Sequence, residues 1–183
     1  MKQDTLEGKA KTTNGYAKVP QLFAQITQPD DVDFLIIPSV SSERRRYVPI
    51  GFATQDIISS NAVQIVPNAT LYHFGVLTSN VHMAWMRAVC GRLKSDYRYS
   101  KEIVYNTFPW PKPTEEQKIK IEQTAQVILN AREQYSDCSL ADMYGEKMYL
   151  FPELVKAHQD NDRAVMQAYG FTKGSEAYKS EAA

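Results

Sequence analysis

The sequence predicts an α+β fold: a small mixed or antiparallel sheet with a packed helix, followed by a C-terminal helical segment. Three observations lead to this prediction. Short apolar runs rich in β-branched and aromatic residues recur through residues 34–77, and the apolar spacing then lengthens to three and four residues at 81–89. A proline-rich connector at 108–113 separates this part from further helical patterns, because prolines at alternate positions stiffen and extend the chain.

Four strands are expected before the first helix. The first is a continuous apolar run closed by Pro38, which is typical of a buried strand. The third ends at the turn signal Pro67-Asn68. The fourth is predicted from its aromatic and branched residues. In chain order, the strand candidates are residues 34–37, 47–52, 62–66 and 71–77.

A helix is predicted next, because apolar side chains recur at helical spacing from Val81 to Val89. Thr78 or Ser79 is the expected N-cap. Residues 92–101 are predicted to form an exposed loop that is basic and aromatic, and residues 103–105 a last short strand.

Beyond the proline connector, local signals predict helices. Thr114 and Gln117 form a capping box at the start of one helix, and Pro152 suits the first turn of another. A short helix is expected at 140–144, and Gly170 supplies a helix stop. We therefore divide the chain into a linker (1–17), an α+β domain (18–111), a C-terminal helical segment (112–171) and a tail (172–183).

The charge distribution favours a polyanionic partner for the middle of the chain. The 183 residues have a formal net charge of zero, but residues 41–101 contain eight Lys/Arg against three Asp/Glu, and both flanks are acidic. The two cysteines, Cys90 and Cys138, form no disulfide framework, and no stretch has the length of a membrane span. We expect a cytoplasmic protein without a membrane partner.

Motifs for catalysis are absent from the sequence. No Gly-rich loop follows a predicted strand, no Asn-Pro-Pro-Tyr tetrapeptide occurs, and no Cys/His cluster has metal-ligand spacing. The three histidines are isolated and are interpreted as structural. We therefore expect no enzyme activity, no cofactor and no small-molecule substrate for this chain alone.

The basic segments suggest DNA recognition. Arg44, Arg45 and Arg46 precede a predicted strand, and a second basic cluster lies at 92–101. Lys94 and Asp96 would point the same way in an extended loop. A lysine can donate to guanine and an aspartate can accept from cytosine, so this pair could read one G·C base pair.

The sequence resembles the C-terminal part of the MmeI-like family, single-chain type II restriction–modification enzymes. The resemblance runs from about Val19 to Phe171. It implies a target-recognition domain and a helical segment that lack the catalytic domain. In that family an adenine-N6 methyltransferase domain uses S-adenosylmethionine, and a nuclease domain uses magnesium. The similar stretches are SSERRRYVPIGF, ISSNAVQIVPNATLYHFGVLTS, HMAWMRAVCGRLKSDYRYS, VYNTFPWP and AHQDNDRAVMQAYGF.

The resemblance also implies positions that contact DNA. Those implied to read bases are Ser39, Asn61, Ala62, Lys94, Asp96 and Arg98. Those expected to bind phosphates are Arg44, Arg45, Arg46, Arg92 and Lys101. Two alternatives stay open here: Asn61 could serve only as a turn or cap residue, and the three consecutive arginines could form a salt-bridged surface cluster.

Two functions from different classes follow from the sequence. The first is a double-stranded DNA recognition module that delivers an adenine to a methyltransferase domain of the same parent chain. The second is a protein-interaction module whose C-terminal helices dock the catalytic domain or another subunit. Reversing the charges at Lys94 and Asp96 distinguishes them, because only a recognition module should then change its preferred base pair.

Overall fold

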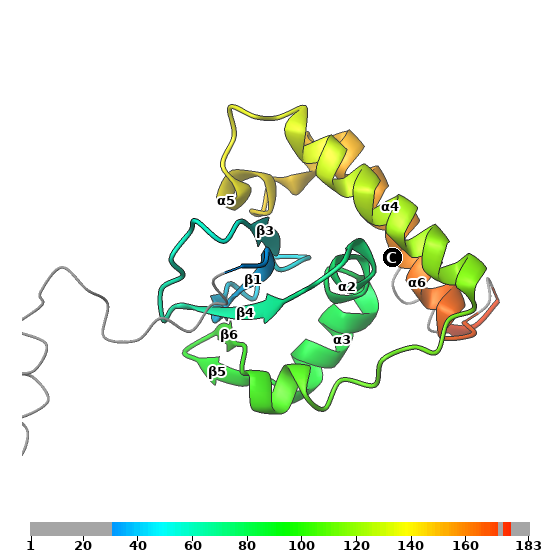
Figure 1. Ribbon diagram of the computed structural model, residues 1–183, viewed down its shortest axis with the longest axis horizontal. Coiled ribbons are helices and arrows are strands. Elements are labelled where there is room, and N and C mark those ends of the chain that lie inside the picture. Colours follow the sequence, from blue (N-terminus) through cyan, green and yellow to red (C-terminus); the bar gives the residue numbers. More distant parts are fainter. Residues whose placement is uncertain (1–30, 172–173, 177–183) are drawn as a thin grey trace, which may run out of the picture.

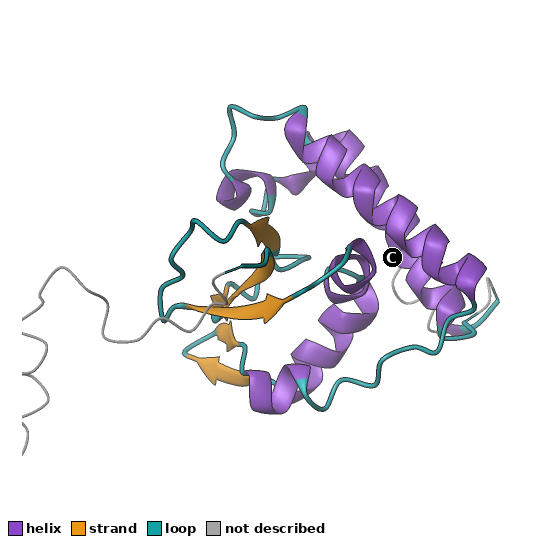
Figure 2. Cartoon of the chain, in the orientation of Figure 1, coloured by secondary structure: helices purple, strands orange, loops and turns teal. Residues whose placement is uncertain are grey.

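The computed structural model describes residues 31–171 and 174–176 (Figure 1). The expected linker at 1–17 and most of the expected tail at 172–183 lie outside these residues. The α+β fold class is confirmed: short strands gather on one side of the molecule and the long helices lie on the other (Figure 2). Within the described ranges, no helix combines the length and the apolar character that a membrane crossing requires.

Two three-stranded antiparallel sheets lie next to each other. The first has the order β3-β1-β4 and the second β2-β6-β5. The chain passes from one sheet to the other at Ser39, whose amide donates to the Ala62 carbonyl at 2.9 Å and whose carbonyl accepts from the Tyr99 amide at 2.9 Å. The strands are β1 (Phe34–Pro38), β2 (Val40–Ser41), β3 (Gly51–Ala53), β4 (Val63–Pro67), β5 (Gly91–Leu93) and β6 (Asp96–Arg98).

The strand predicted at 71–77 is wrong, because these residues form helix α2 (Leu71–Leu77). An aromatic and branched run of this length fits a buried helix as well as a strand, and tertiary packing decides between them. Here the helix backbone lies against helix α4 (Glu115–Glu133) so closely that a Cβ on Gly75 would meet the Ile121 side chain at 2.7 Å. This close packing against α4 favours a helix over a strand at residues 71–77.

The helix predicted around 81–89 is confirmed as α3 (Asn80–Val89). Its N-cap is Ser79, one of the two expected residues, and the Ser79 hydroxyl accepts from the His82 amide at 3.4 Å. Such a cap stabilises a helix by about 1 kcal/mol. The cap also fixes where α3 begins, and the first residue of α3 takes part in a buried polar network described below.

Three further predictions need correction. Of the strand expected at 47–52, only its end belongs to β3, because residues 47–50 are irregular and their polar groups are bound by helix side chains. Most of the loop expected at 92–101 belongs to the β5–β6 hairpin, which begins at Gly91. The strand expected at 103–105 is wrong: Lys101–Tyr105 is a π-helical turn, η1, capped by the Ser100 hydroxyl, which accepts from the Ile103 amide.

The C-terminal half follows its local signals closely. The Thr114–Gln117 capping box opens α4, Pro152 lies in the first turn of the last helix, and Gly170 follows that helix with φ of 79°. α4 and α6 lie side by side along one flank of the molecule (Figure 1). The remaining elements of this half are α5 (Leu140–Met143), η2 (Met148–Leu150) and α6 (Pro152–Ala168).

One hydrophobic core is shared by residues from both sides of the proline connector. Leu35, Phe74 and Met86 from the first half are fully buried in the same cluster as Ile128 and Leu154 from the second half. Burial of a side chain of this size contributes about 1.5–3 kcal/mol. The helical segment therefore supports the sheets directly, and the two halves hold each other in a fixed orientation.

Candidate nucleic-acid interface

The two basic segments lie beside each other in the structure. The β5–β6 hairpin contacts the turn after β2 through an ion pair of 3.5 Å between Arg92 and Glu43. Arg44 also lies within electrostatic range of Asp96. The pKa of the Arg44 guanidinium is raised mainly by a hydrogen bond to Glu146, with a smaller contribution from Asp96. The arginine run and the hairpin thus form one continuous surface, which we call the basic surface (residues 43–46 and 91–98).

Lys94 and Asp96 lie at the end of this hairpin. The expectation of an extended loop is wrong, because Lys94 and Ser95 form a two-residue turn and Leu93 pairs with Asp96. Lys94 has φ of 57°, a conformation that costs a residue other than glycine roughly 1–2 kcal/mol. Lys94 is exposed and Asp96 is half-buried. The turn projects a long cationic side chain from the tip of a two-stranded ribbon.

Other predicted base-reading residues lie where the two sheets meet. Ser39 is bonded through its backbone to Ala62, and its hydroxyl accepts from the Gln64 amide nitrogen at 3.1 Å. Arg98 pairs with Val40 in the next strand and is exposed. Ser39, Ala62 and Arg98 therefore lie close together, along the edge where the two sheets meet.

Asn61 belongs to the same edge and lies in a tight turn. The Val63 amide donates to the Ser60 carbonyl at 3.4 Å, and the Ala62 amide donates to the Ser60 hydroxyl at 3.2 Å. The side chain of Asn61 is exposed and has no hydrogen-bond partner among residues 31–171. Asn61 is thus a turn residue by position, and its amide group stays available for a ligand.

The predicted phosphate-binding residues are partly paired with acids. Arg44 contacts Glu146 at 2.7 Å, and Lys101 contacts Glu102 at 3.9 Å. All four side chains are more than 60% exposed, so each pair contributes little to stability and competes only weakly with a phosphate. For Arg44, the surface-cluster alternative and the phosphate-binding role are therefore compatible.

Arg92 is held by contacts within the hairpin itself. Its guanidinium lies 4.0 Å from the centre of the Tyr97 ring and donates to the Ser95 carbonyl at 2.8 Å. A cation–π contact and a hydrogen bond together restrict its rotamers. Arg92 therefore braces the hairpin turn as well as adding positive charge.

A buried polar network behind the basic surface was not found from the sequence. Arg132 on α4 donates to the Tyr144 hydroxyl at 2.8 and 2.5 Å and to the Ile50 carbonyl at 2.8 Å. The Tyr144 hydroxyl in turn lies 2.6 Å from His158 Nε2, and the His158 ring stacks on Tyr47 at 4.2 Å. Burial and the charges of nearby arginines hold the pKa of His158 well below its usual range, so this ring is neutral.

The same network continues along α6 through Asn161 and Asp162. Asn161 donates to the Gly75 carbonyl at 2.8 Å and accepts from the Thr124 hydroxyl at 3.1 Å. Asp162 accepts from the Tyr47 hydroxyl at 2.6 Å. The only sequence signal for this network is the presence of polar residues on the apolar face of a predicted helix.

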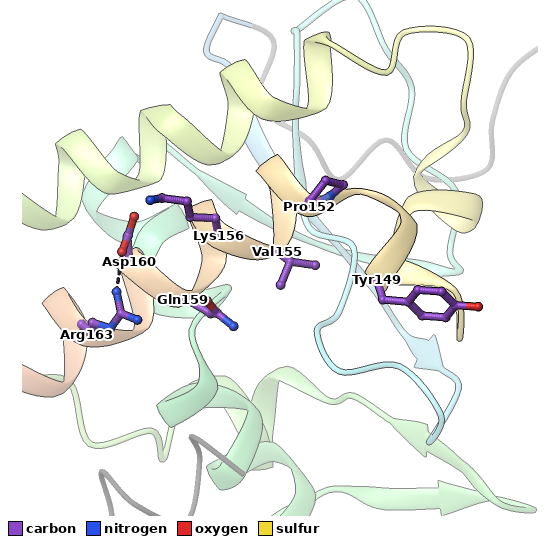
Figure 3. Close-up of a pocket in the computed structure, with 7 residues that line it drawn as sticks. All are labelled: Tyr149, Pro152, Val155, Lys156, Gln159, Asp160 and Arg163. Atoms are coloured by element: carbon purple, nitrogen blue, oxygen red, sulfur yellow. Dashed lines mark hydrogen bonds and ion pairs between the residues drawn. The ribbon is translucent and has the colours of Figure 1, made fainter.

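A groove of about 370 Å³ lies along α6, on the face that carries Val155, Gln159 and Arg163 (Figure 3). Tyr149 stands at one end and is 70% exposed, and an ion pair of 2.6 Å between Asp160 and Arg163 stands at the other. A second hollow of about 340 Å³ lies beside β4 and includes Gln64, Tyr99 and Lys101 in its lining. The second hollow adjoins the edge that holds Ser39.

Comparison with known proteins identifies both halves of the chain. The family model for the MmeI target recognition domain matches residues 1–112, and the model for the MmeI C-terminal domain matches residues 113–182. A solved structure of the type IIL restriction–modification enzyme MmeI in complex with DNA is 46% identical, with a TM-score of 0.83, and covers 94% of this chain.

A curated relative gives a consistent result. DNA methyltransferase A of Bacillus subtilis (strain 168) is 40% identical over 159 residues, which are 87% of this chain. The chain spans 18% of that protein and 23% of the solved MmeI chain. It therefore corresponds to less than a quarter of the length of either relative.

Proposed function

Because this chain belongs to the MmeI family, as a target recognition domain followed by an MmeI C-terminal domain, we propose that it reads the sequence of double-stranded DNA. It would do so for a larger restriction–modification enzyme. The observation that carries the proposal is the basic surface, in which the β5–β6 hairpin projects next to Arg44, Arg45 and Arg46. A two-stranded ribbon fits the major groove, and clustered arginines suit the flanking phosphates.

The hairpin tip supplies the base contacts in this proposal. Lys94 would donate to guanine O6 and N7, and Asp96 would accept from the N4 amino group of the paired cytosine. Asn61 and Arg98, at the edge where the sheets meet, would read neighbouring base pairs. Both side chains are exposed, and neither pairs with an acidic side chain among residues 31–171, which supports these roles.

The chemistry of the parent enzyme would lie outside this chain. We assign methyl transfer from S-adenosylmethionine to an adenine, and any magnesium-dependent cleavage, to the rest of such a protein, after the adenine has been flipped from the duplex. The described residues do not fit S-adenosylmethionine or magnesium. Their strands are all antiparallel with no glycine-rich loop at a strand end, and they hold no cluster of three His, Cys, Asp or Glu. A DNA-reading role would place the protein in the cytoplasm.

A second function is supported for the C-terminal segment. Several of its large apolar side chains are half exposed or more, and they lie on helical surfaces that do not contribute to the shared core. Apolar side chains left exposed in this way can pack against another protein domain. We propose that they dock the methyltransferase domain of the parent enzyme. These side chains are Ile119, Val127, Tyr149 and Leu150.

The experiment is selection of bound duplexes from a random library with the full chain. We expect a consensus with a G·C pair at one position. Exchange of charge, with Lys94→Asp and Asp96→Lys, should remove that preference. A good bidentate contact discriminates by about 1–3 kcal/mol, roughly 5- to 150-fold. The matched control exchanges Lys120 and Glu122 on α4 and should keep the consensus. A consensus unchanged by the hairpin exchange would refute the assignment.

A further inference from the structure

The arginine run of the basic surface is held by contacts from three other elements. Tyr47 follows Arg46 directly, is 2% exposed, and donates its hydroxyl proton to Asp162 on α6 at 2.6 Å. Arg87 on α3 donates to the Arg46 carbonyl at 3.1 Å. Arg44 contacts Glu146, which precedes η2. Two of these three contacts come from the C-terminal helical segment, and of those two only the Tyr47–Asp162 bond is buried.

Asp162 joins three parts of the fold with one carboxylate. One oxygen accepts from the Tyr47 hydroxyl, and the other accepts at 2.8 Å from the amide of Asn80, the first residue of α3. A carboxylate is favoured at this place because the first amides of a helix lack partners within the helix and carry partial positive charge. Burial, with the nearby Asp162 charge, raises the pKa of Tyr47, so the hydroxyl stays protonated and donates.

We propose that Tyr47 and Asp162 are positioning residues, through which helix α6 sets the orientation of Arg44, Arg45 and Arg46 toward the DNA backbone. This inference rests on the proposed function and deepens it. Tyr47 and Asp162 are buried, so neither can touch DNA itself. The AHQDND stretch of the C-terminal domain (residues 157–162) would then orient the arginines through which the recognition domain contacts phosphates.

The geometry separates this role from a simple contribution to stability. Phenylalanine at position 47 would keep the ring that stacks on His158 and lose only the hydroxyl. The hydrogen bond from the arginine run to Asp162 would then be gone, while the stack on His158 and the contacts through Arg87 and Glu146 would remain. We expect the run to shift relative to the hairpin and the fold to persist.

The test measures the salt dependence of DNA binding by the full chain, with a mixed-sequence duplex of about 30 base pairs as the probe. Each phosphate contact contributes about 0.9 to the slope of log affinity against log salt concentration. We expect Tyr47→Phe to lower that slope by about one contact and to weaken binding at low salt by roughly fivefold. Asp162→Asn should act in the same direction. The control Tyr135→Phe also removes a hydroxyl that donates to a carboxylate on α6, Glu153, and should leave slope and affinity unchanged.

The slope is an informative readout because a fraction of misfolded protein lowers the apparent affinity and leaves the slope intact. A second measurement repeats Tyr47→Phe in a chain whose three consecutive arginines are alanine. There we expect no further decrease in slope, since the hydroxyl would have nothing left to orient. A decrease of the same size in that background would overturn the inference.

Two other outcomes separate this inference from the proposed function. If the wild-type chain binds the duplex with a steep slope and Tyr47→Phe keeps that slope, the positioning role is wrong and the proposed function stands. If the wild-type chain shows no salt-dependent binding to duplex DNA, the proposed function is wrong and the positioning role is overturned with it.

Discussion

Lys94→Asn is predicted to make the fold more stable. Lys94 has φ of 57° at the hairpin turn, where an L-residue with a Cβ pays roughly 1–2 kcal/mol. Asparagine adopts this conformation at lower cost because its short polar side chain bonds locally. Lys94 is exposed and has no ion pair or hydrogen bond within the described part of the chain, so the substitution removes no contact.

The expected gain is about half of the conformational cost, or about 0.5–1 kcal/mol in the free energy of unfolding. For a chain of this size, that corresponds to an increase in Tm of about 1–4 °C. Equilibrium urea unfolding, followed by far-UV circular dichroism, measures the difference from the shift of the midpoint at constant slope.

The chain contains its own matched control. Asn68 follows β4, is exposed, and has φ of 56°, nearly the same as Lys94. Asn68→Lys should therefore destabilise the protein by about the amount that Lys94→Asn stabilises it. The reasoning is refuted if Lys94→Asn is neutral or destabilising while Asn68→Lys costs the expected amount. Stabilisation by Lys94→Asn, together with lost base preference, would mean that lysine is kept at the turn for DNA recognition.

Two further predictions concern the helical core and the buried histidines. Gly75→Ala should cost about 1–3 kcal/mol by urea unfolding, because the new methyl group would overlap Ile121, whereas Gly91→Ala has no neighbouring atom within 4 Å and should cost far less. Burial lowers the pKa of His82 to about 4 and that of His158 in the same direction, so the unfolded chain binds more protons below about pH 6.5. The free energy of unfolding should therefore fall as pH drops from 6.5 toward 4, by up to about 1.4 kcal/mol per pH unit for each histidine. His82→Gln should remove the share of that pH dependence that comes from His82, and an unchanged pH profile in this variant would contradict the assignment.

Features governed by local chemistry were predicted correctly from the sequence. The Ser79 cap, the Thr114–Gln117 box and the helix stop at Gly170 each depend on residues within four positions of one another. Pro152 likewise needs only its own fixed φ to suit a first helical turn. These signals set element ends, which is why the C-terminal helices agree with expectation.

Features governed by distant contacts were not predicted. α2 is a helix because Gly75 lets it approach α4, which begins about forty residues later. The Tyr47–Asp162 bond joins residues 115 positions apart, and no local pattern signals it. The hairpin turn was missed for another reason: its left-handed position is occupied by Lys94 and not by the glycine or asparagine that would have indicated a turn. Lys94, which occupies this position in place of glycine or asparagine, is also the residue that we propose to read DNA.

The central claim is that the Lys94 ammonium group contacts a guanine in the major groove. The most direct test measures the affinity of the wild-type chain and of Lys94→Met for a duplex selected by the wild type, with the guanine intact or replaced by 7-deazaguanine, which lacks the N7 acceptor. Loss of one such hydrogen bond should weaken wild-type binding by about fivefold, or about 1 kcal/mol, and leave binding by Lys94→Met unchanged. An equal loss of affinity for both proteins would contradict the claim.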